Sequence, residues 1–190
     1  MALEMKAIRR IVTGNDEAGN STIIFDSDAP NVNVGTIAAS AGMTDVWVFK
    51  ECPANISGHD DDGNLPFSFD PPGQGGHLRI VQSAAKPKDY DPLLDTTAAP
   101  ITAPFQRKGS HTWDKGGKNA YSSPIHQSQT VDYGFVMEGS RTLILDDEER
   151  VLLPGDVVVQ LANWHGWKNP DDTSLMGFIM MGSEPGPEVK

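Results

Sequence analysis

The sequence has few of the features that mark secreted or membrane-spanning proteins. Its only cysteine is Cys52, so no disulfide can form within the chain and nothing indicates an oxidising compartment. No stretch is apolar over the roughly 20 residues that a membrane-spanning helix needs. The opening residues, MALEMKAIRRIVTG, lack the apolar run of a signal peptide. We therefore expect a cytoplasmic protein that does not bind membranes.

Basic residues are also in the minority. The 15 Lys and Arg residues stand against 26 Asp and Glu residues, which gives a formal net charge of −11. An acidic surface repels phosphate groups, so nucleic acids and anionic membranes are disfavoured as partners. The composition instead fits a protein whose partner is a small molecule.

A convincing amphipathic helix is missing as well, apart from a single turn near DPLLD at 91–95. The chain is instead rich in glycine (19) and proline (14). Turn signals separate short apolar runs about every ten residues, which is typical of an all-β sandwich or small barrel. The strand-like runs are IRRIVT, STIIFD, TDVWVFK, GHLRIVQSA, RTLILDDEERVLL, PGDVVVQLA and SLMGFIMMG.

Polar residues alternate within one strand-like stretch, PIHQSQTVDYGFVMEG at 124–139. His126, Ser128, Thr130 and Asp132 occupy every second position. Side chains alternate between the two faces of a strand, so these four share one face. Because the flanking residues are apolar, we interpret this face as one that looks inward, at a metal or a substrate.

This stretch resembles the first motif of the cupin family, which runs Gly, His-x-His, an acid three or four residues later, and Gly. His126 takes the position of the first His, Asp132 that of the acid, and Gly139 that of the closing Gly. Two departures are clear. Ser128 stands where the second His belongs, and an Asp replaces the usual Glu.

A later segment resembles the second cupin motif, which runs Gly, a strand, Pro-x-Gly, two residues, His, three residues and Asn. Gly155 opens the strand, and His165 and Asn169 match the His and the Asn. Gln160 and Ala162 replace the Pro and the Gly. The resemblance is specific over about 120–182, and it is to small cupins of fungal and bacterial secondary-metabolite clusters.

Both the residue types and the resemblance imply one divalent metal ion, held by His126, Asp132 and His165. Two imidazoles and one carboxylate on one side of a metal leave positions open for substrate or water. Such a set suits Fe(II) and also holds Zn, Mn, Ni or Co. Two alternatives stay open, namely a hydrogen-bonded network in a metal-free functional pocket and a purely structural cluster.

Two further polar residues are candidates for catalysis. Ser128 is expected to hydrogen-bond the metal ligands, and Gln160, near a strand end, to reach the metal or orient the substrate. Three residues are candidates for substrate binding. Trp167 shares the strand face of His165, Tyr133 follows Asp132 but points to the other face, and His77 opens a strand near the expected pocket mouth. Ordinary barrel packing is the alternative for the aromatic residues.

The resemblance implies a single cupin barrel, a double-stranded β-helix of the jelly-roll type, with an N-terminal arm. We assign residues 1–50 to the arm and its strands, 51–182 to the barrel with the motif region at 124–182, and 183–190 to a flexible tail. Small cupins commonly dimerise by sheet extension, and the arm would cover an otherwise exposed sheet edge. We therefore expect a homodimer in which the arm packs on the barrel or on a second subunit.

The expected function is that of a metal-dependent enzyme acting on a small, partly apolar carbonyl or phenolic metabolite of polyketide type. In the favoured branch the metal acts as a Lewis acid, as in a lyase, dehydratase or decarboxylase. The first alternative is an Fe(II)-dependent dioxygenase. The second is a cupin that binds a ligand without catalysis.

Overall fold

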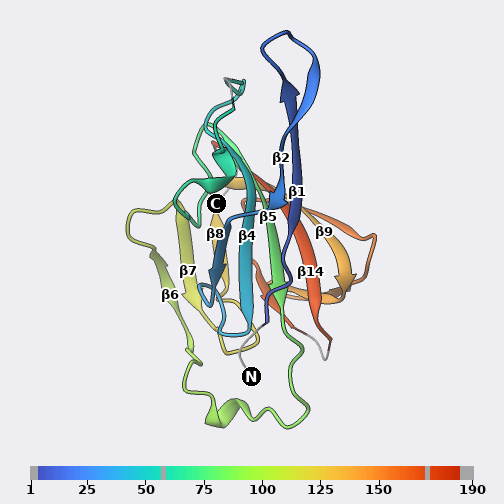
Figure 1. The fold of residues 1–190 in the computed structure, drawn as a ribbon. Coiled ribbons are helices and arrows are strands. Elements are labelled where there is room, and N and C mark those ends of the chain that lie inside the picture. The colour runs from blue at the N-terminus through green and yellow to red at the C-terminus, as the bar shows by residue number, and fades with distance from the viewer. Residues whose placement is uncertain (1–3, 57–58, 170–171, 185–190) are drawn as a thin grey trace.

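The computed structural model describes residues 4–56, 59–169 and 172–184, and these residues form almost only β-strands (Figure 1). The described regular helix amounts to two 3₁₀ turns, η1 (Asp62–Asn64) and η2 (Pro92–Leu94), and the second is the turn expected at DPLLD. No helix in these ranges is long and apolar enough to cross a membrane. The all-β prediction is therefore confirmed.

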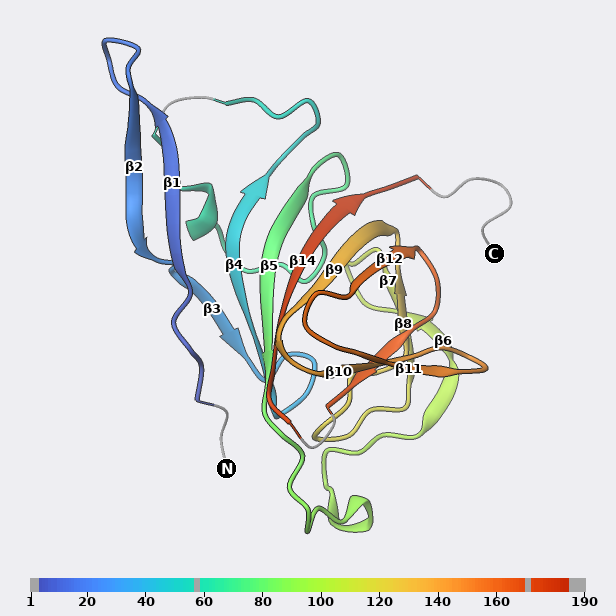
Figure 2. The ribbon, with the colours of Figure 1, turned by 90° about the vertical axis from the view of Figure 1, so that its right-hand side faces the viewer.

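One six-stranded antiparallel sheet forms the larger wall of the barrel, in the order β12-β9-β14-β5-β4-β3 (Figure 2). Its strands come from both halves of the chain, which places residues far apart in the sequence side by side. They are β3 (Asn31–Val34), β4 (Ala41–Phe49), β5 (Gly76–Ser83), β9 (Thr130–Gly139), β12 (Val157–Leu161) and β14 (Ser174–Gly182).

Two three-stranded sheets form the facing wall. One has the order β6-β7-β8, with β6 (Ile101–Gln106), β7 (Thr112–Gly116) and β8 (His126–Ser128). The other has the order β11-β10-β13, with β10 (Arg141–Ile144), β11 (Glu149–Leu152) and β13 (Gly166–Lys168). Isolated bridges join the two sheets at His126–His165 and at Ser122–Lys168. The two walls make the single jelly-roll barrel that was predicted.

The core lies between these walls. Met43, Val81, Met176 and Val136 stand side by side across β4, β5, β14 and β9, and all four are buried. This row follows from strand alternation, because directly paired residues point to the same face of a sheet. The facing wall contributes Trp167, whose ring meets that of Phe178 edge to face at 5.7 Å.

Residues 1–50, assigned to the arm and its strands, form two separate parts. Only the hairpin of β1 (Arg9–Asn15) and β2 (Ser21–Asp28) stands apart from the barrel (Figure 2), whereas β3 and β4 belong to its main sheet. β1 and β2 pair with each other, whereas β4 pairs with β3 and β5, so the later strands of residues 1–50 are part of the barrel sheet. The predicted tail at 183–190 lies mostly outside the described residues.

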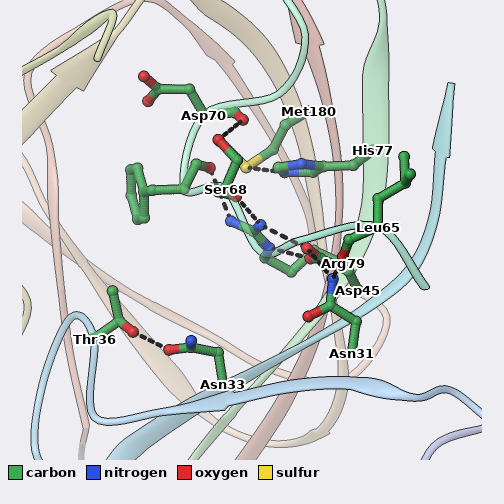
Figure 3. Close-up of polar contacts among 11 residues, drawn as sticks. Asn31, Asn33, Thr36, Asp45, Leu65, Ser68, Asp70, His77, Arg79 and Met180 are labelled. Carbon is green, nitrogen blue, oxygen red and sulfur yellow. Dashed lines mark hydrogen bonds and ion pairs between the residues drawn. The ribbon is translucent and has the colours of Figure 1, made fainter. Parts of the chain in front are cut away.

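Arg79 fastens the loop between β4 and β5 to the barrel. Its buried guanidinium pairs with Asp45 at 2.6 Å and donates to the carbonyl oxygens of Ser68 and Phe69 at 2.6 and 2.9 Å (Figure 3). The loop is thereby held over the barrel interior. Phe69 consequently lies against the ring of His126, with 6.0 Å between the ring centroids.

Candidate functional site

Two histidines meet where the halves of the facing wall join. His126 and His165 exchange both backbone hydrogen bonds, at 2.8 and 2.9 Å, so their side chains share one face and their ring centroids lie 4.4 Å apart. The Nδ1 atoms of these rings donate to the carbonyl oxygens of Pro124 and Asn163 at 2.9 and 3.0 Å. Since a carbonyl only accepts, the protons sit on Nδ1. Each Nε2 therefore carries a free lone pair.

Burial keeps both rings neutral. It lowers the pKa of His126 to about 4 and the pKa of His165 to about 3, where the neighbouring imidazole lowers the value further. Desolvation disfavours the charged form of any group that is removed from water. At pH 7 the cavity therefore holds two uncharged nitrogen donors.

Asp132 on β9 and Gln160 on β12 are cross-strand neighbours, and both side chains are buried. Within the part of the chain that the structure describes, Asp132 Oδ1 and both terminal atoms of the Gln160 side chain lack a hydrogen-bond partner. Burial raises the pKa of Asp132 to about 6. An unpartnered buried polar group costs about 1–3 kcal/mol. This pair therefore has the character of a site for a ligand.

One internal cavity of about 50 Å³ connects these groups. His126, His165, Asp132, Gln160, Trp167 and Arg141 are among the residues that line it. By volume it holds about three to five water molecules, or a slender ligand of similar volume.

The three predicted metal ligands line this one cavity, but they do not converge. In the described ranges, no group of three or more His, Cys, Asp or Glu side chains has the geometry to hold a metal ion. The imidazoles of His126 and His165 are adjacent, whereas Asp132 comes from the opposite wall and would have to turn toward them. Metal binding therefore stays a prediction.

Of the other predicted residues, Gln160 and Trp167 line the cavity. Trp167 is buried and its ring meets that of His165 edge to face at 6.2 Å. This placement matches the expectation that Trp167 shares the strand face of His165.

Ser128, Tyr133 and His77 are not brought to this cavity. The hydroxyl of Ser128 lies 2.6 Å from that of Thr112 and lines a neighbouring cavity. Tyr133 is 38% exposed on the outer face of β9. His77 is buried, but its Nε2 contacts Sδ of Met180 at 3.2 Å and it lines a separate cavity (Figure 3).

The position of Ser128 reflects a break in the predicted strand. The stretch 126–139 forms two strands, because pairing changes partner at Gln129: β8 pairs with β7, and β9 pairs with β12 and β14. The alternation itself persists, and all four polar residues from His126 to Asp132 are buried. Ser128 and Thr130, on either side of the break, line the neighbouring cavity, whereas His126 and Asp132 line the main one.

Sequence reasoning missed several residues that line the cavity, among them Arg141, Arg79 and Phe69. For Arg141 a signal was available, since it alternates with the buried Leu143 in the hairpin run RTLI. Phe69 belongs to a loop, and its position depends on the contacts of Arg79 with that loop.

No family model matches the chain. Curated relatives match parts of it. A cupin-domain-containing oxidoreductase of Neurospora crassa is 50% identical over 60 residues, which are 30% of this chain and 31% of that protein. The phomopsin biosynthesis cluster protein D of Diaporthe leptostromiformis is 38% identical over 66 residues, 33% of this chain and 35% of that one. The matched segments thus span about a third of these relatives.

Solved structures show only distant likeness. The polyketide cyclase RemF of Streptomyces resistomycificus covers 81% of this chain and 72% of its own length, with 14% identity and a TM-score of 0.41. The EutQ protein of Clostridium difficile covers 92% and 88%, with 9% identity and a TM-score of 0.42. Scores this low say nothing about function.

The chain thus combines a jelly-roll barrel and a histidine pair on its facing wall with a partial sequence likeness to cupin-domain-containing proteins. Over the matched third of its length, it is similar to cupins of fungal secondary-metabolite clusters.

Proposed function

We propose that this cupin is a metal-dependent enzyme of secondary metabolism that acts on a small, partly apolar carbonyl or phenolic metabolite. The observation that carries the proposal is the set of free donor atoms in one buried cavity. These are Nε2 of His126 and of His165, Oδ1 of Asp132 and the side-chain amide of Gln160. Relatives from biosynthetic clusters support the metabolic setting.

The donor chemistry fits a divalent cation. Neutral imidazole nitrogens and carboxylate or amide oxygens suit Fe(II), Zn, Mn, Ni or Co. We assign His126 and His165 as the ligands already in place. The oxygen ligand is Asp132, or Gln160 in its stead, after a side-chain rotation toward the imidazoles. When bound, the metal supplies Lewis acidity that polarises a carbonyl oxygen of the substrate.

The chain's own residues then position the substrate. The amide of Gln160 has both a donor and an acceptor without partners, so it can orient a substrate carbonyl or hydroxyl. Trp167, Phe178 and Phe69 contribute apolar surface to the wall of the cavity. Such an apolar enclosure strengthens polar interactions inside it. These features suit proton removal beside a carbonyl, as in a dehydratase or other lyase.

A redox enzyme that uses the same ligands is the second candidate. It is favoured by the relatives from Neurospora crassa and Hypocrea virens, both named cupin-domain-containing oxidoreductases. In this branch the metal is Fe(II) and the reaction consumes oxygen. Turnover assays with and without oxygen separate the two branches.

Metal counting by mass spectrometry tests the shared premise. Wild type, His126→Ala and His165→Ala should be stripped with a chelator, reconstituted with one metal at a time and desalted. We expect one metal per chain in the wild type and loss of it in both variants. His59→Ala is the matched control, since His59 is exposed and far from both motifs in the sequence. Equal metal content in all four proteins would refute His126 and His165 as metal ligands and favour a cupin that binds a ligand without metal catalysis.

A further inference from the structure

We propose that Arg141 forms an anion subsite, so that the substrate carries a carboxylate that this guanidinium binds. The inference rests on the proposed function in taking the same cavity as the substrate site. It goes further in assigning a charge to the substrate.

Arg141 opens β10 and points into the barrel. It is 3% exposed, shares its strand face with the buried Leu143 and lines the cavity that holds the histidine pair. Both of its hydrogen bonds run from Nη1, to the hydroxyls of Ser83 and, at 3.3 Å, Ser174. Nε is buried without a partner. In the described chain Nη2 makes no hydrogen bond either, so one edge of the guanidinium stays free.

The other buried arginines are neutralised, and Arg141 is not. Arg79 pairs with Asp45 at 2.6 and 3.1 Å, and Arg10 forms a two-pronged ion pair with Asp61. Among the residues that the structure describes, no carboxylate pairs with Arg141. Burial lowers its pKa to about 10, which still leaves it charged at pH 7.

A buried cation without a counter-ion is costly. The penalty for removing an ion from water amounts to several kcal/mol even after relaxation. The two serine hydroxyls hold Nη1 but bring no charge. A ligand carboxylate would supply both the missing charge and two parallel acceptors for Nε and Nη2, the bidentate geometry that arginine favours.

The position of the subsite constrains the shape of the substrate. Ser174, which holds Arg141, opens β14, whereas Met180, the strand neighbour of Asp132, lies near the end of β14. The anion therefore binds at the opposite end of the cavity from the Asp132–Gln160 pair. Apolar residues, among them Val81, Met176 and Trp167, line the length between. We infer a slender molecule with a carboxylate at one end and its reacting carbonyl or hydroxyl at the other.

Binding to metal-free protein tests the subsite independently of metal and turnover. The probes are octanoate and 1-octanol, which share a chain and differ in charge, measured by isothermal titration calorimetry. We expect wild type to bind octanoate at least tenfold more tightly than octanol. Arg141→Met should abolish this preference. Arg141→Lys, which keeps the charge but loses the two parallel N–H donors of the guanidinium, should reduce it. Arg150→Met is the matched control, because Arg150 is exposed on the neighbouring strand β11, and it should bind as wild type does.

Equal affinity of wild type for both probes, or no binding of octanoate at millimolar concentration, overturns the proposal. So does an octanoate preference that survives in Arg141→Met. The wild-type comparison decides the matter even where a variant fails to fold. If reconstituted wild type binds no metal but still binds octanoate through Arg141, the proposed metal enzyme is refuted and the anion subsite stands.

Discussion

Asp132 and Gln160 are directly paired across β9 and β12, yet their buried side chains are not bonded to each other. A carboxylate oxygen and a complete amide lie side by side without partners in the described structure. Each such atom carries a desolvation cost of about 1–3 kcal/mol. A fold that keeps these three atoms unpartnered is suited to binding a ligand between the two side chains.

Gln160→Leu should leave the metal-free protein as stable as wild type, or more stable by about 1–3 kcal/mol, because it removes an unpartnered amide. The same change should abolish turnover. Urea denaturation gives the stability. Gln127→Leu is the control: the amide of Gln127 donates to the carbonyl of Ala162, so its loss should destabilise. A clear loss of stability in Gln160→Leu, with activity per folded molecule unchanged, would make Gln160 structural.

Trp167→Ala should cost about 3–5 kcal/mol of folding free energy, as large-to-small changes in cores do. Trp167 is buried between the rings of His165 and Phe178, so a role in stability comes with its role in the cavity. Trp164→Ala, at a half-buried ring that stacks on the Lys115 ammonium, should cost less than about 1 kcal/mol. Chemical denaturation of both variants compares them directly, and similar costs would contradict the placement of Trp167.

The metal-free protein should lose stability as the pH falls below about 6.5. Burial lowers the pKa of His77, His126 and His165 to about 2, 4 and 3, so the unfolded state takes up these protons first. Asp132 acts in the opposite sense, because its raised pKa of about 6 favours the folded state at low pH. Three histidines outweigh one carboxyl.

Denaturation midpoints between pH 5 and 8 measure this slope. His77→Gln should flatten it, because His77 stays neutral in the folded state over this range but takes up a proton in the unfolded state. His59→Gln should leave it unchanged, because His59 is exposed. A stability that is constant or rises on acidification would contradict the prediction.

The protein should be a homodimer in solution. The β1–β2 hairpin projects from the barrel (Figures 1 and 2). Its residues Ile11 and Ile23 are exposed and would be covered by a second subunit. Light scattering at micromolar concentration should give about twice the chain mass of 20.5 kDa. The double change Ile11→Glu, Ile23→Glu should give monomers, and Val151→Glu, at an exposed apolar residue of β11, should not. A concentration-independent wild-type monomer would refute the assignment.

Asp45→Asn should destabilise the protein by about 3–5 kcal/mol, because it leaves the buried Arg79 without its charge partner. Asp26→Asn breaks the exposed pair with Arg9 and should have a much smaller effect, because water and salt screen that pair. Thermal and chemical denaturation report both costs. Equal effects would show that the buried pair does not anchor the loop that carries Phe69.

The sequence alone determined the local features of this protein. Alternation predicted that His126, Ser128, Thr130 and Asp132 would all be buried, and they are. The acidic turn predicted the β10–β11 hairpin, and the two-residue spacing put Trp167 on the face of His165. These features follow from the two-residue period of a strand and from turn chemistry, which nearby residues set.

Only the tertiary structure decided which of these buried groups meet. The change of partner at Gln129 places His126 and Ser128 on β8 but Thr130 and Asp132 on β9, and register across β9, β12 and β14 pairs Asp132 with Gln160 and Met180. The convergence of Ser83 and Ser174 on Arg141 brings together three strands that are distant in the chain. Strand pairing is a non-local choice, made by the packing of the whole barrel. The strand period therefore tells which residues point inward, and the fold tells what they face.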